Sequence, residues 1–260
     1  MPETDLDLLI KAARASGEIA KTFFQNEPKT WDKDDGAGPV TEADLAVNTY
    51  LEDVLRTARP EYGWLSEESL DDTKRQSNEY VFIIDPIDGT RSFIEGSRTW
   101  AHSLAIAREG SVTAAAVLLP MRDLMFSAAL DQGATLNGRP LGVTGQDGFE
   151  TSEILATRPA LQSHHWRAGT APEFSRHHRP SLAYRLALIG QGRFDAMLTL
   201  RPSWEWDIAA GALIVSEAGG TISDKTGRSL KFNNLDPRLN GVVAAGPSLH
   251  SEIIDKLAAT

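Results

Sequence analysis

Two segments near the start of the chain carry apolar residues at the spacing of a helix with one buried face. The first runs from Asp5 to about Phe24, and the second begins at Thr41 and ends near Arg59. Apolar residues three and four positions apart lie along one side of a helix, and that side has to be covered in a folded protein. We therefore predict two amphipathic helices, separated by a loop.

Short runs of β-branched and aromatic residues follow, as is typical of strands. The run Tyr80–Ile84 is almost wholly apolar, and we expect a strand buried on both faces. Three more candidate strands come in close succession at 104–107, 112–119 and 124–129. Glu109-Gly110 and Asn137-Gly138 mark turns between them. The first half of the chain therefore predicts helices followed by an antiparallel meander.

Residues 142–152 are rich in Gly, Thr, Ser and Asp, and we expect them to link two halves of the molecule. The N-terminal half, 1–141, would be α+β and carry most of the candidate ligands. In the C-terminal half, 153–260, candidate strands alternate with candidate helices. The strands are expected at 154–156, 196–200 and 242–245, and the helices at 182–190, 208–218 and 249–258. This alternation predicts an α/β half, packed with the first as one unit.

The composition is that of an ordinary globular protein. Of 260 residues, 41% are hydrophobic and 24% are charged, which suffices for a large core and differs from a disordered chain. The absence of cysteine excludes disulfides, thiolate zinc sites and a cysteine nucleophile. The sequence has neither an apolar run approaching ~18 residues nor an N-terminal export signal, so we expect a cytoplasmic protein with no membrane contact.

The charge balance is acidic and limits the choice of partners. Lys and Arg number 26 against 36 Asp and Glu, for a net charge of −10 at pH 7, and no basic cluster is evident. Such a chain would repel a polyphosphate backbone, so we expect no nucleic-acid partner. If the ligand is an anion, a cation has to mediate its binding, and a metal ion is the obvious candidate.

The strongest chemical signal is the run I-I-D-P-I-D-G-T at residues 83–90. A buried strand leads directly into Asp85 and Asp88, two carboxylates separated by a proline and an isoleucine. Hard cations such as Mg²⁺ bind oxygen ligands, and these carboxylates with the carbonyl of Ile87 would supply them. The glycine that follows lets the backbone approach a ligand, and a helical turn after it would direct N–H groups at a bound phosphate. An ordinary Asp-Gly turn is the alternative.

Three further acidic motifs also have ordinary structural explanations. Glu67 and Glu68 come shortly after the apolar pair Trp64-Leu65, which suggests a strand that delivers Glu67 to a cleft, although adjacent acids often form a solvated pair. Asp207 follows two tryptophans and would be either the N-cap of the next helix or a shielded carboxylate committed to a partner. Asp44 completes a capping-box pattern at the start of the second helix.

Taken together, the motifs P-V-T-E-A-D, L-S-E-E-S, I-I-D-P-I-D-G-T and W-D-I-A-A-G resemble the inositol monophosphatase superfamily in their order and spacing. The resemblance extends from the first predicted helix to the last. It implies an α-β-α-β-α layered sandwich of the inositol monophosphatase/fructose-1,6-bisphosphatase type. It also implies a magnesium-dependent, lithium-sensitive phosphatase that acts on a small-molecule phosphate ester with two or three Mg²⁺ per site. The oligomeric state stays open, with a homodimer among the options.

The resemblance also assigns metal ligands. The first metal would be held by two carboxylates and a carbonyl, those of Glu67, Asp85 and Ile87. The second would be held by three carboxylates, those of Asp85, Asp88 and Asp207, so that Asp85 bridges the two ions. A third and weaker position would lie near Glu67, with Lys33 and Glu68 in its vicinity.

The same resemblance implies catalytic and phosphate-binding roles. Asp44 and Thr90 would orient and deprotonate the attacking water, with Glu67 as a further catalytic residue. The backbone N–H groups of Gly89 and Thr90 would contact the phosphate, and Asp88 would border it.

The substrate is less sharply defined by these motifs. Inositol monophosphatases usually carry an acidic residue a few positions before the W-D motif, and the stretch 197–202 has none. The L-S-E-E and W-E-W-D forms, with a basic residue at Arg185, are more similar to bacterial 3'(2'),5'-bisphosphate nucleotidases. We therefore assign Ser181 and Arg185 to substrate binding and expect hydrolysis of adenosine 3',5'-bisphosphate. Inositol 1-phosphate is the alternative substrate, and a solvated helix charge is the alternative explanation for Arg185.

Other protein classes have less support in the sequence. A binding protein without turnover would keep the metal-binding acids, but Asp44 and Thr90 are present as well. The pairs His164-His165 and His177-His178 lack the H-E-x-x-H spacing of metallohydrolases, and we expect them in surface loops. Gly190-Gln191-Gly192 lacks the third glycine of a dinucleotide fingerprint, and the G-x-S-x-G motif of serine hydrolases is absent.

Overall fold

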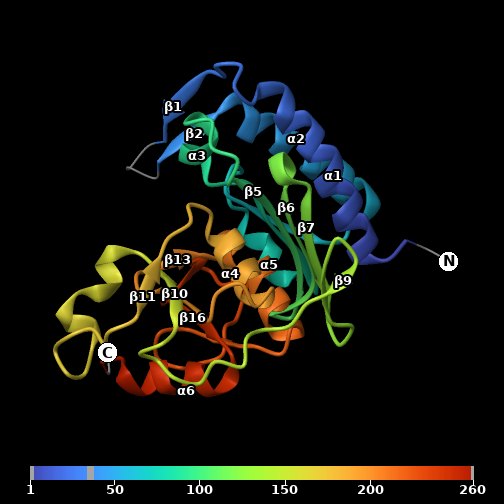
Figure 1. Cartoon of the computed structure of the whole chain (residues 1–260). Helices are drawn as coiled ribbons and strands as arrows, with labels where there is room; N and C mark the ends of the chain where they lie inside the picture. Colours follow the sequence, from blue (N-terminus) through green and yellow to red (C-terminus); the bar gives the residue numbers. More distant parts are fainter. Residues whose placement is uncertain (1–2, 34–37, 259–260) are drawn as a thin grey trace.

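In the computed structural model, sheets and helices alternate in layers (Figure 1). The structure describes residues 3–33 and 38–258. The helices α1 (Asp5–Phe23) and α2 (Glu42–Ala58) form one outer layer, and α6 (Pro247–Lys256) covers the opposite side. Two sheets lie between them, separated by α4 (Leu182–Gly190) and α5 (Glu205–Glu217). This arrangement confirms the predicted α-β-α-β-α sandwich.

The larger sheet has seven strands in the order β3-β4-β5-β6-β7-β8-β9. They are β3 (Gly63–Ser66), β4 (Tyr80–Asp88), β5 (Ala101–Arg108), β6 (Ser111–Leu119), β7 (Leu124–Ala129), β8 (Ala134–Leu136) and β9 (Arg139–Pro140). β3 runs parallel to β4, and all other neighbours are antiparallel, so the predicted meander is present. The turns at Glu109-Gly110 and Asn137-Gly138 have positive φ at both residues, as tight hairpins require.

The smaller sheet has five strands in the order β11-β10-β12-β16-β14. They are β10 (Glu153–Ala156), β11 (Ser175–His177), β12 (Ala196–Thr199), β14 (Thr221–Ser223) and β16 (Val242–Ala245). β10 pairs in parallel with both of its neighbours, whereas β16 is antiparallel to β12 and β14. There are also two small antiparallel two-stranded sheets: β1 (Thr30–Asp32) with β2 (Pro39–Thr41), and β13 (Ser203–Trp204) with β15 (Arg238–Leu239).

Three apolar cores hold the layers together. The alternation of side chains along β4 shows how: Phe82 and Ile84 face α1 and α2, whereas Val81 and Ile83 face α4 and α5. The third core fills the space between the smaller sheet and α6. The prediction that β4 is buried on both faces is therefore correct. In the part of the chain described, no helix is both long and apolar enough to cross a bilayer.

The middle core draws residues from both sides of the expected boundary at 142–152. It joins, for example, Ala105 of β5 to Leu186 of α4. Residues 142–152 contain no helix or strand. The division into 1–141 and 153–260 stays a proposal, and the shared core means that the two parts are packed against each other.

Two predicted boundaries were wrong in ways that affect the site. The strand predicted to end at Ile84 continues to Asp88, because a bulge between Asp85 and Asp88 lets β4 pass through its proline and stay paired with β5. The helix predicted from 208 begins at Glu205, with Trp204 as its N-cap. Asp207 is therefore inside the first turn and is not the cap. The hairpin β1–β2 was missed because all three β1 residues are exposed, which leaves no alternating apolar pattern.

α4 and α5 approach each other closely at a glycine. A Cβ atom at Gly211 of α5 would lie 2.4 Å from the Cβ of Leu186 on α4. Only hydrogen on that Cα permits this contact, which brings the first turn of α5 and the start of α4 to the same region.

We predict that Gly211→Ala destabilises the protein. The better helix propensity of alanine is worth up to ~1 kcal/mol, but forcing the helices apart costs about 1–3 kcal/mol. Urea unfolding should therefore show a lower free energy of unfolding. Gly142→Ala is the matched control, since a Cβ there would have no atom of the described residues within 4 Å. An unchanged midpoint for Gly211→Ala would show that the helices separate without cost.

Candidate functional site

The parallel pairing of β3 and β4 places the acidic motifs of two chain segments side by side. The strands end together, with Ser66 opposite Ile84, and the N–H of Glu67 donates to the Ile84 carbonyl at 3.1 Å. Glu67 therefore lies next to Asp85, which follows Ile84 directly. The strand predicted to deliver Glu67 is present and brings it beside Asp85, while the expected cleft stays a prediction.

Three carboxylates converge at the end of β4. Asp85, Asp88 and Asp207 each offer an oxygen atom, and these atoms lie within 4.8 Å of one another. Burial raises the pKa of Asp85 well above its ordinary value, and the charges of Glu67, Asp88 and Asp207 raise it further. Burial and the charges of Asp88 and Glu67 likewise raise the pKa of Asp207. A cluster in which every acid opposes the ionisation of its neighbours is suited to a cation.

The N-terminus of α4 holds Asp88 in place. Asp88 Oδ2 accepts hydrogen bonds from Ser181 Oγ at 2.5 Å and from the N–H of Ala183 at 2.6 Å. Ser181 is also the N-cap of α4, because its Oγ accepts from the N–H of Tyr184 at 3.0 Å. Ser181, assigned from the sequence to the substrate, thus contacts a metal-site carboxylate. Its role toward a substrate stays a prediction.

Thr90 and Asp44 form a buried pair. Thr90 Oγ1 lies 3.2 Å from both Asp44 Oδ1 and the Ile87 carbonyl oxygen. It begins the short helix α3 (Thr90–Ile94), preceded by Gly89 at a φ of 100° that suits glycine. Asp44 Oδ2 accepts from the N–H and the hydroxyl of Thr41 at 2.8 and 2.6 Å, which confirms the capping box. Asp44 thus caps α2 with one oxygen and meets Thr90 with the other.

The environment of Asp44 changes its acidity. The side chain is fully buried, and burial raises the pKa of its carboxyl to about 6. The hydrogen bonds from Thr41 oppose this rise, while the charge of Glu67 adds to it. A carboxylate with a pKa close to neutrality can accept a proton and release it again under physiological conditions.

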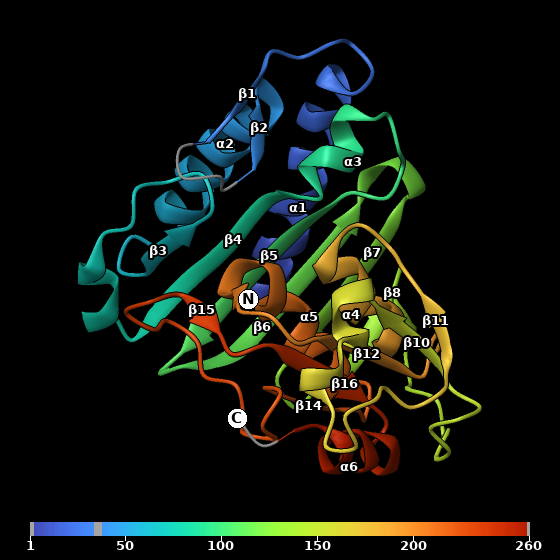
Figure 2. The same ribbon diagram turned by 90° about the vertical axis from the view of Figure 1, so that its left-hand side faces the viewer.

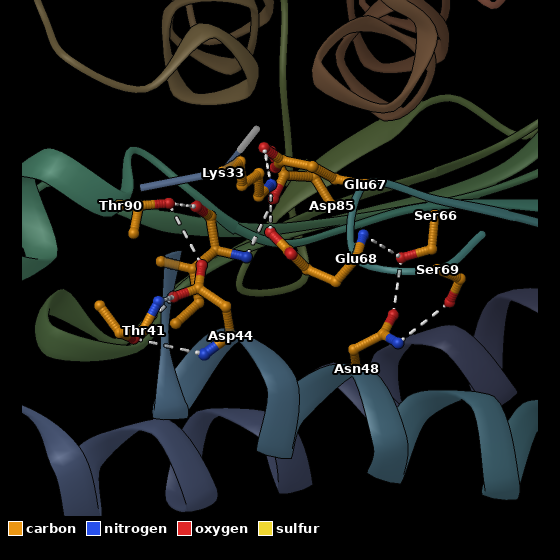
Figure 3. A network of polar contacts seen from close by, with 11 residues as sticks. Lys33, Thr41, Asp44, Asn48, Ser66, Glu67, Glu68, Ser69, Asp85 and Thr90 are labelled. Carbon is orange, nitrogen blue, oxygen red and sulfur yellow. Dashed lines mark hydrogen bonds and ion pairs between the residues drawn. The ribbon is translucent and has the colours of Figure 1, made fainter. Parts of the chain in front are cut away.

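Lys33 lies between Glu67 and Glu68. Its Nζ is 2.8 Å from Glu67 Oε1 and 2.6 Å from Glu68 Oε1 (Figure 3). Burial lowers the pKa of Lys33, but the two carboxylates outweigh it and the net shift is upward. Burial raises the pKa of Glu68 to about 7, against the effect of Lys33. The expected neighbours of the third metal position are therefore together, with an ammonium group at their centre.

A polar network that we did not predict ties the segment Ser66–Ser69, which contains Glu67 and Glu68, to α2 (Figure 3). Ser66 Oγ donates to Asn48 Oδ1 at 2.6 Å, and Asn48 Nδ2 donates to Ser69 Oγ at 3.1 Å. Asn48 lies one helical turn after Asp44, so the two polar residues share a face of α2. Two polar residues at this spacing on an otherwise apolar helix face could have indicated from the sequence that Asn48 belongs to the site.

Glu205 was also missed, although it precedes Asp207 by only two residues. It is fully buried, and it accepts hydrogen bonds from the N–H groups of Asn233 at 2.6 Å and Asn234 at 2.9 Å. These bonds fix the first turn of α5, and with it the position of Asp207.

Arg185 is buried, so its alternative interpretation as a solvated helix charge was wrong. Its side chain donates from Nε to the Arg179 carbonyl at 2.5 Å and from Nη2 to the Pro180 carbonyl at 2.9 Å. In the described residues Nη1 makes no hydrogen bond. Arg185 thus holds the loop that leads to Ser181, and its predicted contact with a substrate stays open. His164 and His178 are exposed, as expected, whereas His165 and His177 are half-buried. His177 ends strand β11, so the expected loop location was wrong for it.

Comparison with known proteins places the chain among phosphatases. The model of the inositol monophosphatase family matches residues 1–260. Nus factor SuhB of Pseudomonas aeruginosa is 33% identical over 234 residues, which cover 85% of this chain and 86% of that protein. Inositol-1-monophosphatase of Mesorhizobium japonicum is 32% identical over 254 residues, which cover 93% and 91%.

Solved structures agree with this placement. An IMPase of Thermotoga maritima superposes with a TM-score of 0.82 at 26% identity and covers 96% of this chain and 95% of that one. SuhB of Bartonella henselae gives a TM-score of 0.81 at 26% identity, with 96% of both chains covered. Since the family match spans the whole sequence and the fold agrees, this chain belongs to the inositol monophosphatase family of phosphatases.

Proposed function

We propose that this chain is a Mg²⁺-dependent phosphomonoester hydrolase. The proposal depends on one juxtaposition: the clustered carboxylates of Asp85, Asp88 and Asp207 lie at the same end of β4 as the Thr90–Asp44 pair. The first group suits a hard cation, and the second can take a proton from water. Hydrolysis of a phosphate ester by an activated water requires both.

The donors of the site fit Mg²⁺, because all of them are oxygen atoms. Glu67, Asp85 and the Ile87 carbonyl would hold one ion, and Asp85, Asp88 and Asp207 would hold another. Lys33 and Glu68 border the proposed third position. When bound, the ions would supply positive charge for the phosphate and make a water molecule more acidic. This is how an acidic protein can bind an acidic substrate.

The remaining steps belong to side chains of the protein. Thr90 Oγ1 would hold the attacking water, and the proton would pass through this hydroxyl to Asp44 Oδ1, 3.2 Å away. Asp44 can accept it because burial raises its pKa to about 6. Glu67 would help to orient the same water. Gly89 and Thr90 would direct backbone N–H groups at the phosphate, as the family resemblance implies.

Adenosine 3',5'-bisphosphate is the substrate that we propose, because arginines border the metal site. Burial raises the pKa of Asp88, and the charge of Arg185 opposes that rise. Burial likewise raises the pKa of Asp207, and there the opposing charge is that of Arg201. Arg201 is exposed, and its guanidinium makes no hydrogen bond or ion pair with the residues that the structure describes. It lies in the stretch where inositol monophosphatases carry an acid. The uncleaved phosphate would meet Arg201 and Nη1 of Arg185.

Inositol 1-phosphate is the second candidate. The observation in its favour is the relative from Mesorhizobium japonicum, whose name is inositol-1-monophosphatase and which matches 93% of this chain. Inhibition by lithium, a cytoplasmic location and the absence of a nucleic-acid partner are further proposals, carried by the resemblance and by the composition.

Asp85→Asn should abolish turnover and weaken Mg²⁺ binding strongly. The ionised Asp85 is destabilising in the metal-free fold, because burial and neighbouring charges raise its pKa. In EDTA, the thermal midpoint of Asp85→Asn at pH 8 should therefore be at least as high as that of the wild type. Asp236→Asn, at an exposed site, is the control. Full activity of the wild type in EDTA would contradict the metal-dependent mechanism.

Thr90→Ala should lower kcat by roughly 10²–10⁴, the usual contribution of a positioned proton-transfer group, with little change in KM. Thr90→Ser keeps the hydroxyl and should retain most of the activity. Steady-state kinetics with Mg²⁺ measure both variants. If Thr90→Ala raised KM and left kcat unchanged, Thr90 would contribute to substrate binding and not to the activation of water.

The substrate is tested by initial rates on adenosine 3',5'-bisphosphate and inositol 1-phosphate. Arg201→Ala should lower kcat/KM for the bisphosphate about 10–100-fold, the value of one charge-assisted phosphate contact, and leave inositol 1-phosphate nearly unchanged. Arg228→Ala removes an exposed arginine elsewhere and is the control. Faster hydrolysis of inositol 1-phosphate by the wild type, with no loss in Arg201→Ala, would favour the second candidate.

A further inference from the structure

The metal-binding turn contains an irregularity that faces a buried histidine. Asp85 pairs with Ser103 and Asp88 with Ala101 across β4 and β5, so Pro86 and Ile87 lie opposite the single residue His102. In such a bulge the extra residue leaves the regular ladder, and its backbone groups need other partners. Because the bulge lies between Asp85 and Asp88, its geometry determines how these acids are presented.

One peptide group of the bulge is held from both sides. His102 Nδ1 is hydrogen-bonded to the carbonyl oxygen of Pro86, and since a carbonyl only accepts, Nδ1 carries the proton. The N–H of the same peptide, at Ile87, donates to Asp85 Oδ1 at 2.9 Å. A donor on the carbonyl polarises the peptide and strengthens its N–H as a donor. The imidazole of His102 and the carboxylate of Asp85 are therefore connected through the planar Pro86–Ile87 peptide group.

The hydrogen bond from Ile87 orients the carboxylate of Asp85. The Ile87 N–H engages Oδ1 and thereby fixes the orientation of the carboxylate that would bridge the two ions. The next carbonyl along the chain, that of Ile87, is the backbone ligand expected for the first metal. Rotation of the Pro86–Ile87 peptide would disturb the carboxylate and this carbonyl together.

The side chain of His102 lies in the interior, where the Ser16 carbonyl is a second polar group near its ring besides the Pro86 carbonyl. It is fully buried, and the ring of Trp100 packs against it edge to face at 5.6 Å. Burial lowers the pKa of His102 to about 4, against the opposing effect of the Pro86 and Ser16 carbonyls, so the ring is neutral. With the proton on Nδ1, Nε2 has no hydrogen-bond partner among the residues that the structure describes. An unsatisfied buried nitrogen costs about 1–3 kcal/mol, and an apolar side chain would avoid that cost.

We propose that His102 is a positioning residue of the metal site: its Nδ1–H holds the Pro86–Ile87 peptide and thereby orients Asp85 and the Ile87 carbonyl toward the cation. The inference rests on the proposed function, since it assumes that these groups bind metal. It assigns no contact between His102 and the metal or the substrate.

The test compares two substitutions at this position. Asn places an amide N–H close to the location of Nδ1, whereas Leu fills similar space without a donor. Titration calorimetry with Mg²⁺ in the absence of substrate should show roughly 10-fold or greater loss of affinity for His102→Leu, as for other residues that orient metal ligands. His102→Asn should recover most of that loss. Thermal unfolding in EDTA shows whether each variant folds.

A third variant covers the case in which His102→Leu does not fold. Gln carries the same amide as Asn but one carbon further out, so His102→Gln should bind Mg²⁺ more weakly than His102→Asn. The proposed role of His102 is wrong if His102→Leu or His102→Gln binds Mg²⁺ with wild-type affinity, or if His102→Asn and His102→Leu bind it equally weakly. Neither result would contradict the metal site itself. A wild-type protein that binds no Mg²⁺ overturns the proposed function as well.

Nitrogen-15 NMR of the imidazole provides a readout that does not depend on metal. The metal-free wild type should show the neutral tautomer with the proton on Nδ1. A proton on Nε2 would contradict the hydrogen bond on which the inference depends.

Discussion

Buried carboxylates repel one another at the end of β4, and the surrounding elements have to hold them together. Asp85, Asp88 and Asp207 bring their oxygens within 4.8 Å of one another, and Glu67 adds its charge from the adjacent strand. Without a cation this arrangement costs folding free energy, because each acid opposes the ionisation of the others. The packing of the molecule has to hold the acids in place against that repulsion, and the ligand has to compensate it.

Elements of two layers, the larger sheet and the central helices, contribute to that restraint. β3 and β4 end side by side, which fixes Glu67 next to Asp85. At the start of α4, Ser181 donates a hydrogen bond to Asp88, and the first turn of α5 contains Asp207. α4 and α5 belong to the second half of the chain, yet they pack beneath the larger sheet in the same core as β4 and β5 (Figures 1 and 2). The site therefore exists only when the two halves are packed together.

Several residues of the site have a structural and a chemical role at once. Asp44 caps α2 with one oxygen and meets Thr90 with the other, so the capping box and the catalytic hypothesis were not alternatives. Ser181 likewise caps α4 and binds Asp88. A helix cap is rigid, and a rigid carboxylate or hydroxyl loses little freedom when it engages a ligand.

The family, the layered fold and most helices and strands could be predicted from the sequence, because periodic apolar patterns and four acidic motifs are local features of the chain. The sequence also pointed to the acids that cluster at the end of β4. Only the tertiary structure decided that Arg185 is buried against the Arg179 and Pro180 carbonyls, that Glu205 anchors α5, and that His102 faces the bulge in β4. Those facts depend on which backbone groups are left unpaired after distant segments pack, and no local pattern records that.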